Sequence, residues 1–272
     1  MRLVPKIALS RLVGVLVNIP LPQPLGRKSV EWFASAYDID AQEAELPLSS
    51  YRTVGAFFTR RLKPGARPIG DGVVHPADAL ITQAGRVDAQ TLLQAKGKTY
   101  TVSGLLGGER FGARFEGGAF FTYYLCPTDY HRVHAPVDGH VVWGCHIPGA
   151  LWPVNSRSVE SVDGLFVKNE RVIAVIETPK GLAAVVMVAA TNVGNMTLAF
   201  DPSLDAAGRA GAAGVTERSY DPGIPVRHGE EFGVFNMGST VIMLYEKGVL
   251  DAEPGRFKGQ RSQMGESLSA LS

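Results

Sequence analysis

Apolar and polar positions divide the chain into a helical start and a strand-rich remainder. Between residues 2 and 17 apolar side chains recur at helical spacing, which predicts an amphipathic helix. Three prolines, at positions 20, 22 and 24, prevent that helix from continuing. From about residue 73 to 250 the pattern changes to short β-branched and aromatic runs separated by Gly, Pro, Asn or Asp. The sequence therefore predicts an α+β, predominantly β protein with N-terminal helices.

Four runs carry the clearest strand pattern, at 119–125, 139–145, 171–178 and 182–193. The Pro-Lys-Gly at 179–181 has the composition of a hairpin turn between the last two runs. Many short strands with few helices indicate a barrel-like or sandwich-like antiparallel core.

Charge and cysteine content restrict the classes of partner. The chain carries 27 Lys and Arg against 26 Asp and Glu, so no overall field favours nucleic acid, and no nucleic-acid partner is expected. The only cysteines, Cys126 and Cys145, form no closely spaced pair, and they are expected to be free thiols in a reducing compartment. Histidines near them are scattered, so no metal site is predicted.

The N-terminal segment has two open interpretations. The uncharged stretch at 12–25 is shorter than the roughly 20 residues that a membrane-spanning helix needs. It also lacks a small-residue cleavage site, so it is not a secretory signal. It is either an anchor in the membrane interface or a helix docked on the domain.

A group of cations surrounds the pair Phe57-Phe58. It consists of Arg52, Arg60, Arg61, Lys63 and Arg67. Such a group is either an ordinary solvated face or a surface that contacts phosphate head groups.

The run 232–245 places Gly238-Ser239 inside a predicted strand. A glycine there marks a bulge or a close backbone approach. Its missing Cβ also leaves its carbonyl open to attack by the hydroxyl of Ser239, so the chain could cut itself at this bond. Taken alone, a bulge followed by two strand hydroxyls explains the same residues.

Two further segments carry candidate chemistry. Asp78 stands alone among apolar and small residues, and a buried carboxylate must be paired or hydrogen-bonded. His131 and His134 follow a helix-start signal, Pro127-Thr128-Asp129, and in a short helical turn they would share one face. On a strand they would point to opposite sides.

Together these segments resemble the phosphatidylserine decarboxylase family of pyruvoyl enzymes. Met237-Gly238-Ser239-Thr240 stands where that family usually has Leu-Gly-Ser-Thr, and 130–136 resembles its Y-H-x-x-H-x-P signature. The resemblance covers about residues 50–248 in the same order. It also includes the segments 57–69, 168–171 and 190–194. His75 and Ala79 depart from the family's usual Ser-Pro-Ala-Asp-Gly around Asp78.

The resemblance implies a division of labour for self-processing. His134 would act as general base on Ser239, and Asp78 would orient the imidazole. Ser239 would attack the carbonyl of Gly238 to give an ester. β-Elimination would then leave dehydroalanine at 239, which hydrolyses with loss of ammonia to a pyruvoyl group, the covalent cofactor. The products are a β chain of 1–238 and an α chain of 239–272, a heterodimer whose new ends are expected to stay paired in the sheet.

The resemblance also implies the reaction. The pyruvoyl group would form a Schiff base with phosphatidylserine and accept the electrons left when carbon dioxide departs, and His131 would protonate the carbon. The product is phosphatidylethanolamine. The protein is then expected at the membrane surface, as a peripheral protein on the cytoplasmic face of the cell membrane.

Three regions are expected: a membrane-associating helical segment at 1–45, a β-rich catalytic domain at 46–250 and a loosely ordered tail at 251–272. Three alternatives to the main function stay open on sequence grounds. They are a decarboxylase of another serine phospholipid, a non-catalytic lipid-binding β module, and a hydrolase that uses Asp78, His134 and Ser239 intermolecularly.

Overall fold

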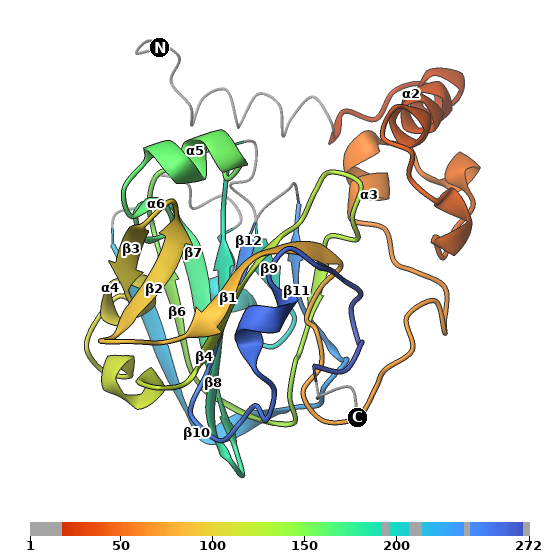
Figure 1. Ribbon diagram of the computed structural model, residues 1–272. Helices are drawn as coiled ribbons and strands as arrows, with labels where there is room; N and C mark the ends of the chain where they lie inside the picture. The colour runs from red at the N-terminus through yellow and green to blue at the C-terminus, as the bar shows by residue number, and fades with distance from the viewer. Residues whose placement is uncertain (1–17, 192–195, 207–213, 237–239, 269–272) are drawn as a thin grey trace.

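The structure is a computed structural model that describes residues 18–191, 196–206, 214–236 and 240–268. Its centre is an eight-stranded antiparallel sheet with the order β10-β6-β7-β8-β12-β4-β1-β13, shown in Figure 1. A three-stranded sheet, β5-β11-β9, and a hairpin, β2-β3, accompany it. The strands are β1 (Ala79–Arg86), β2 (Thr91–Ala95), β3 (Lys98–Thr101), β4 (Ala119–Tyr124), β5 (Arg132–His134), β6 (Gly139–Ile147), β7 (Arg171–Thr178), β8 (Gly181–Val188), β9 (Met196–Leu198), β10 (Thr216–Val226), β11 (Glu231–Phe235), β12 (Thr240–Tyr245) and β13 (Arg261–Ser262).

Short helices surround the sheets. The α-helices are α2 (Gln23–Ala36), α3 (Val54–Phe58), α4 (Val102–Leu106), α5 (Ser156–Ser161) and α6 (Leu165–Lys168). The 3-10 turns are η1 (Ala41–Glu43), η2 (Leu48–Ser50), η3 (Gly112–Phe115), η4 (Pro202–Leu204) and η5 (Pro254–Phe257). Within the described residues, no helix is both long and apolar enough to cross a membrane.

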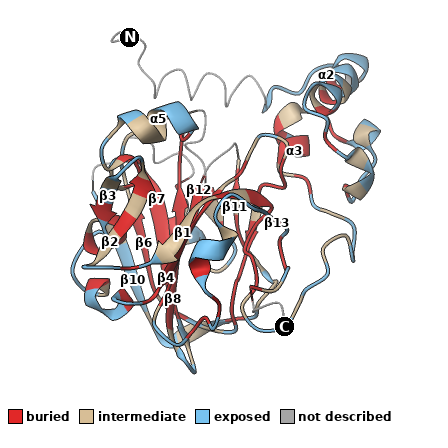
Figure 2. Cartoon of the chain, in the orientation of Figure 1, coloured by how far each residue is buried: buried red, intermediate tan, exposed pale blue. Residues whose placement is uncertain are grey.

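The eight-stranded sheet is buried on both faces. Along β7, Val172 and Ala174 point into the core that includes the three-stranded sheet, whereas Ile173 and Val175 point into the core under the β2-β3 hairpin and α4. Figure 2 shows these central strands as the buried interior of the molecule. Burial on both faces explains why β7, β8 and β12 are continuous apolar runs rather than alternating ones.

The predicted fold class is confirmed. The runs at 119–125, 139–145 and 171–178 form β4, β6 and β7, and the turn at 179–181 joins β7 to β8 with Thr178 opposite Gly181. The arrangement is sandwich-like rather than a closed barrel. β8 ends at Val188, before the end of the predicted run. The helix expected at 2–17 lies outside the described residues.

An N-terminal layer packs beside the sheets. α2 and α3 bury a small cluster that contains Val30, Tyr51 and Phe57. Thr53 caps α3 because its hydroxyl accepts a hydrogen bond from the N–H of Ala56, 3.1 Å away. This cap sets the start of the short helix that carries Phe58 toward the site.

The C-terminal segment corrects one expectation. Residues 251–268 are not a loose tail, because Leu268 is fully buried and its N–H donates to the carbonyl of Val73 at 2.7 Å. β13 extends the large sheet beside β1, and the N–H of Gly265 bonds the carbonyl of His75. These long-range backbone bonds hold the segment against 70–81. Their partners lie far away in the sequence, which is why local composition misjudged it.

Candidate active site

In the sequence, the candidate cleavage dipeptide falls between strands that belong to two different sheets. β11 ends at Phe235 in the three-stranded sheet, and β12 begins at Thr240 in the middle of the large sheet, between β8 and β4. Asn236 is a bend, so a single strand through 232–245 is wrong. Gly238 and Ser239 themselves lie outside the described residues. Both flanking strands are paired, but they belong to two different sheets rather than to the one sheet that was expected.

The expected shared face of His131 and His134 is also wrong. The segment after the 127–129 turn is not helical, because Arg132–His134 forms β5 and pairs with β11. In extended backbone, side chains three positions apart point to opposite sides, and those four apart point to the same side. Tyr130 and His134 accordingly lie together, with ring centroids 5.6 Å apart, whereas the ring of His131 packs on Phe58.

Two hydrogen bonds fix the ring of His134. Its Nδ1 lies 2.8 Å from the carbonyl oxygen of Gly229, which can only accept, so Nδ1 carries the proton. Its Nε2 then accepts from the hydroxyl of Tyr130 at 3.1 Å. Burial lowers the pKa of His134, and the bond to Gly229 only partly opposes this effect. The imidazole is therefore neutral at physiological pH, with its basic nitrogen on the side of Tyr130.

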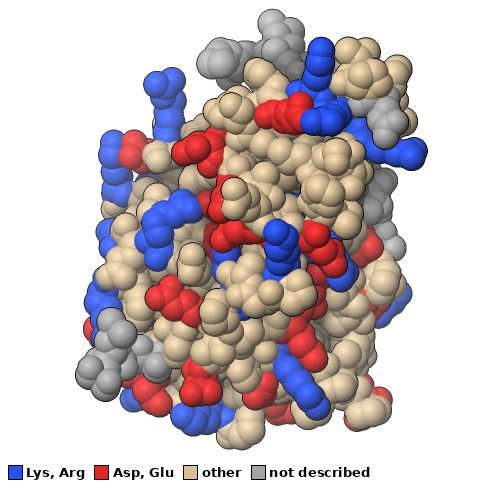
Figure 3. Space-filling model, turned by 90° about the vertical axis from the view of Figure 1, so that its right-hand side faces the viewer, with Lys and Arg blue, Asp and Glu red and all other residues tan. Residues whose placement is uncertain are grey.

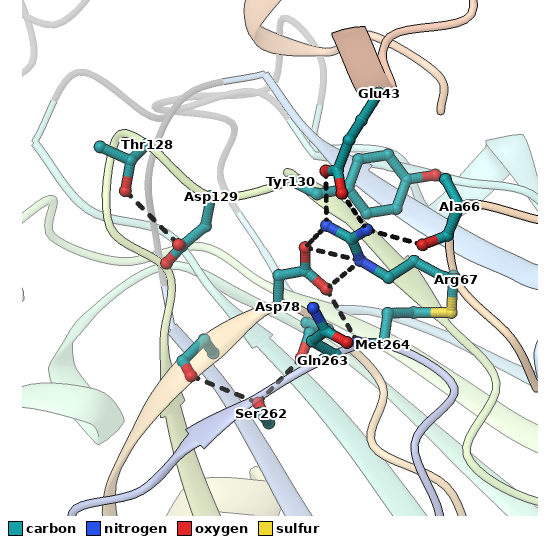
Figure 4. A network of polar contacts seen from close by, with 12 residues as sticks. Glu43, Ala66, Arg67, Asp78, Thr128, Asp129, Tyr130, Ser262, Gln263 and Met264 are labelled. Carbon is teal, nitrogen blue, oxygen red and sulfur yellow. Dashed lines mark hydrogen bonds and ion pairs between the residues drawn. The ribbon is translucent and has the colours of Figure 1, made fainter. Parts of the chain in front are cut away.

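Asp78 is held by Arg67 rather than by His134. Arg67 Nε lies 3.1 Å from each carboxylate oxygen, and Nη2 lies 2.7 Å from Oδ2 (Figure 4). The backbone N–H of Met264, from the C-terminal segment, donates to Oδ1 at 2.8 Å. Among the described residues, Asp78 forms no direct hydrogen bond with His134, although one was expected. The carbonyl of Gly229 orients the imidazole instead.

Arg67 joins Asp78 to Glu43. Its Nη1 and Nη2 bind the two oxygens of Glu43 at 2.8 and 2.9 Å, which is a bidentate pair. Hydrogen bonding to Glu43 raises the pKa of Arg67, and the bond and charge of Asp78 raise it further against the effect of burial. Asp78 still acts on His134 through space, since its negative charge raises the pKa that burial lowers.

His131 is fully buried and has one nitrogen without a partner. Its Nδ1 donates to the carbonyl of Asp129 at 2.8 Å, and Nε2 has no hydrogen-bond partner among the described residues. The ring packs on Phe58 with centroids 3.8 Å apart. Burial lowers its pKa to about 3. Because the N–H of Phe235 bonds the carbonyl of His131 at 3.0 Å, this neutral imidazole stands beside the end of β11.

The segment 168–171 supports the loops around the site. Asn169 donates to the carbonyls of Trp152 and Ala189, and thereby ties the end of β8 to the 150–155 loop. Arg171 is buried and donates to four backbone carbonyls, those of Gly104, Leu105, Val167 and Asn169. Its role is structural, and burial lowers its pKa to about 10. The residues 192–195 that follow this strand end lie outside the described chain.

Sequence reasoning missed three residues of the site. The sequence pattern places Arg67 in a group of cations around Phe57-Phe58, although only 9% of its side chain is exposed, and it assigns no role to Tyr130. The one available signal for Arg67 was the rule that a buried carboxylate needs a partner. The carbonyl of Gly229, which fixes the His134 tautomer, leaves no signal in the sequence.

The described residues offer no set of ligands for a metal ion. They contain no group of three or more His, Cys, Asp or Glu side chains that could hold a metal ion. Cys126 and Cys145 are free.

Comparison with known proteins gives the family. The sequence model of the family described as phosphatidylserine decarboxylase matches residues 54–270. The chain belongs to this family. It is 47% identical over 271 residues to the phosphatidylserine decarboxylase proenzyme of Anaeromyxobacter sp. (strain K), a match that covers 98% of this chain and 95% of that protein. It is 43% identical over 249 residues to that of Myxococcus xanthus (strain DK1622), covering 90% and 88% of the two chains.

Family membership confirms the resemblance read from the sequence, and it places this chain among decarboxylase proenzymes. The proenzyme of Acidovorax ebreus (strain TPSY) is 39% identical over 273 residues, with 98% of this chain and 94% of that protein covered. These relatives match 90–98% of the chain, and the family model covers the segments that contribute Arg67 and Met264.

Proposed function

We propose that this chain is a phosphatidylserine decarboxylase that makes its own pyruvoyl cofactor and forms phosphatidylethanolamine and carbon dioxide. The observation that carries the proposal is the pair of buried, neutral histidines beside the strands that flank Gly238-Ser239. A neutral imidazole can accept a proton near neutral pH, which both the cutting step and the decarboxylation need.

His134 would start self-processing. Its Nε2 takes the proton of the Ser239 hydroxyl, and the oxygen attacks the carbonyl carbon of Gly238 while the amide nitrogen of residue 239 leaves as an amine. The resulting ester loses its carboxylate by β-elimination, which separates the chains and leaves dehydroalanine. Water then replaces the nitrogen, ammonia departs and residue 239 becomes pyruvoyl. Asp78 stabilises the protonated form of His134 through space, as a buried negative charge does.

The two products would remain one molecule. The β chain keeps β11 between β5 and β9, and the α chain keeps β12 between β8 and β4. The α chain also returns to the β chain through β13 and through the bond from Met264 to Asp78. These contacts support a stable α/β heterodimer after cleavage.

The pyruvoyl group supplies an electron sink for the bond that breaks when carbon dioxide leaves. His131 fits beside such a group, because its Nε2 is an unpartnered, buried acceptor close to the end of β11. It would take a proton from the substrate's ammonium group and return it to the carbon that loses carbon dioxide.

A peripheral position on the cytoplasmic face of the membrane belongs to the same proposal. α2 and the segment before it expose apolar side chains that a domain surface normally hides, with Leu25 at 56% and Trp32 at 69% exposure. Arg27 and Lys28 lie on the same helix. Figure 3 shows basic side chains at the upper end of this side of the molecule, while acidic and basic residues are interspersed below. Apolar area with adjacent cations suits an anionic lipid surface.

The reaction is tested by carbon dioxide release from carboxyl-labelled phosphatidylserine dispersed in detergent. The purified protein should release labelled carbon dioxide, and the Ser239→Ala variant should release none. A related ether-linked serine phospholipid, measured in parallel, tests the choice of substrate. Faster turnover of the ether-linked lipid would make that lipid the assigned substrate. If neither lipid releases carbon dioxide, the proposal is contradicted.

Membrane binding is tested by sedimentation with anionic liposomes. Removing residues 1–25 should weaken sedimentation more than it weakens turnover of detergent-dispersed substrate. Sedimentation equal to that of the full chain would mean that the segment is structural.

A further inference from the structure

Arg60 is a buried cation without a counter-ion. Its residue exposure is 5%, and no carboxylate of the described residues forms an ion pair with it. Its Nη2 reaches the carbonyl of Thr128 at 3.3 Å, its Nη1 reaches that of Phe57 at 3.5 Å, and its guanidinium lies over the Phe57 ring, 4.9 Å from the centroid. Its Nε has no hydrogen-bond partner among the described residues. Asp78 and Glu43 act on it only through space, and Arg67 already binds both. A buried charge left in this state is costly, so the fold keeps it at the expense of stability.

Arg60 and His131 belong to one place in the molecule. Phe58, two residues before Arg60, packs on the ring of His131, and Thr128, which Arg60 contacts, precedes His131 by three residues. Both side chains have a buried nitrogen without a partner, Nε in one and Nε2 in the other. The charge of Arg60 also adds to burial in lowering the pKa of His131.

This place is close to the candidate cleavage bond. The N–H of Phe235 is bonded to the carbonyl of His131, and Gly238 follows Phe235 by three residues. Ser239 follows Phe235 by four residues, and four residues of extended chain span at most about 14 Å. Two unsatisfied buried nitrogens therefore lie within reach of the residue that would carry the cofactor.

We propose that Arg60 is the binding residue for the phosphodiester of the substrate. The inference rests on the proposed function and extends it. In a serine phospholipid the phosphorus is three bonds from the carbon that loses carbon dioxide. A proton donor for that carbon and a cation for the phosphodiester must therefore stand side by side, as His131 and Arg60 do. A guanidinium with a free Nε matches phosphate oxygens in geometry and charge.

The carboxylate of the substrate is the other anion that Arg60 could hold, and the chemistry argues against it. An ion pair with the departing carboxylate stabilises the ground state and has to be broken before carbon dioxide leaves, which lowers the rate. A phosphodiester keeps its charge throughout the reaction, so its binding costs nothing at the chemical step. It is also retained in the product.

Binding of the product shows which of the two anions Arg60 holds, because phosphatidylethanolamine has the phosphodiester and lacks the carboxylate. The experiment uses processed protein in detergent, as wild type, Arg60→Met, Arg60→Gln and the control Arg61→Met, whose side chain is 62% exposed. Self-cleavage is read from a gel. KM and kcat are measured with short-chain phosphatidylserine, and the Kd of short-chain phosphatidylethanolamine by calorimetry.

Both Arg60 variants should cleave themselves and should raise KM and the product Kd by similar factors, about 10- to 100-fold, as expected for a lost hydrogen bond to a charged group. Arg61→Met should change neither constant. Arg60→Gln keeps a donor for the carbonyl of Thr128, and it decides the result if Arg60→Met does not fold. Unchanged constants overturn the inference, as does a raised KM with an unchanged product Kd, which would place the carboxylate on Arg60. Failure of both variants to fold would make Arg60 structural.

Failure of the proposed function gives a different result. A wild-type protein that releases no carbon dioxide from phosphatidylserine contradicts that function directly. The inference about Arg60 fails on its own when the wild type is active and the Arg60 variants give one of the contrary results named above.

Discussion

Arg67 binds Asp78 side-on. Its Nε lies 3.1 Å from each of the two carboxylate oxygens, and its Nη2 lies 2.7 Å from Oδ2. The same guanidinium binds Glu43, so two carboxylates share a single cation. Asp78 is thus positioned by the segment that follows α3 and by the C-terminal segment through Met264. Its alignment depends on parts of the chain far from the cleavage bond.

Replacing Arg67 by Met should therefore impair self-cleavage. Removing one partner of a buried pair typically costs about 3–5 kcal/mol, because it leaves the other charge uncompensated, and here two carboxylates lose their partner. Arg67→Lys should be intermediate, since an ammonium cannot bind both carboxylates side-on. The uncleaved fraction is measured on a gel, with Arg61→Met as the exposed control. Complete cleavage of Arg67→Met at the wild-type rate would show that the position of Asp78 does not matter.

The two histidines should separate by the step that each one serves. His134→Ala and Asp78→Asn should leave a mostly uncleaved chain, because the Ser239 hydroxyl then lacks an oriented base; a loss of order 10⁴ would parallel the misoriented base of a hydrolase triad. His131→Ala should cleave and then decarboxylate about 10²–10⁴-fold more slowly, the usual contribution of general acid–base catalysis.

Gel mobility and carbon dioxide release, measured side by side, test this separation. Ser239→Ala is the reference that should lack both activities. Efficient cleavage by His134→Ala, or full turnover by His131→Ala, would show that the roles are reversed or misplaced. The different ring contacts of the two histidines support separate roles.

The extended backbone at 131–134 also shows where sequence reasoning stopped. Strand runs such as 171–178 were predictable because their β-branched residues suit a sheet that is buried on both faces. The helix-start signal at 127–129 was local, and pairing of β5 with β11 overrode it. Local composition contains no information about a partner strand about 100 residues away.

The same limit explains the site. Ser239, His134, His131 and Asp78 were identifiable by their chemistry and by resemblance. The partners that hold them are Arg67, the Gly229 carbonyl and the Met264 N–H, two of which are backbone groups that any residue supplies. Contacts of this kind follow from the path of the chain, and only the structure gives that path.

Acid should destabilise the folded protein because it buries neutral histidines. Burial lowers the pKa of His75 to about 4 and that of His131 to about 3, both below the usual 6.5. The unfolded chain therefore binds more protons below pH 6.5, and stability falls as the pH decreases toward these lowered values. Each such histidine contributes a slope of up to about 1.4 kcal/mol per pH unit.

His75→Ser tests this slope, since it introduces the residue that the family commonly has there. Urea unfolding of the uncleaved Ser239→Ala chain is compared with and without this change between pH 7.5 and 5. The variant loses the hydrogen bond between His75 and Tyr123 and should be less stable at pH 7.5, but its stability should decrease less steeply with acid. Equal slopes would mean that His75 does not titrate in this way.

Trp32 should contribute to membrane binding. It is the most exposed of the large apolar side chains described, and it lies on α2 beside the cations of that helix. Trp32→Ser should weaken sedimentation with anionic liposomes, whereas Trp32→Phe should largely retain it because an aromatic ring still enters the interface. Carbon dioxide release in detergent should be the same for both variants. Equal sedimentation of the two variants would show that the aromatic ring at position 32 does not contribute to membrane binding.

The central claim is that residue 239 becomes the cofactor, and intact-mass spectrometry of the purified protein tests it most directly. The account predicts two chains, residues 1–238 and 239–272, and a second chain that is lighter by one ammonia than the same chain beginning with Ser239. Reduction with borohydride should add hydrogen to the new ketone. A single chain of 272 residues, or a second chain that begins with an unmodified serine, would contradict the account.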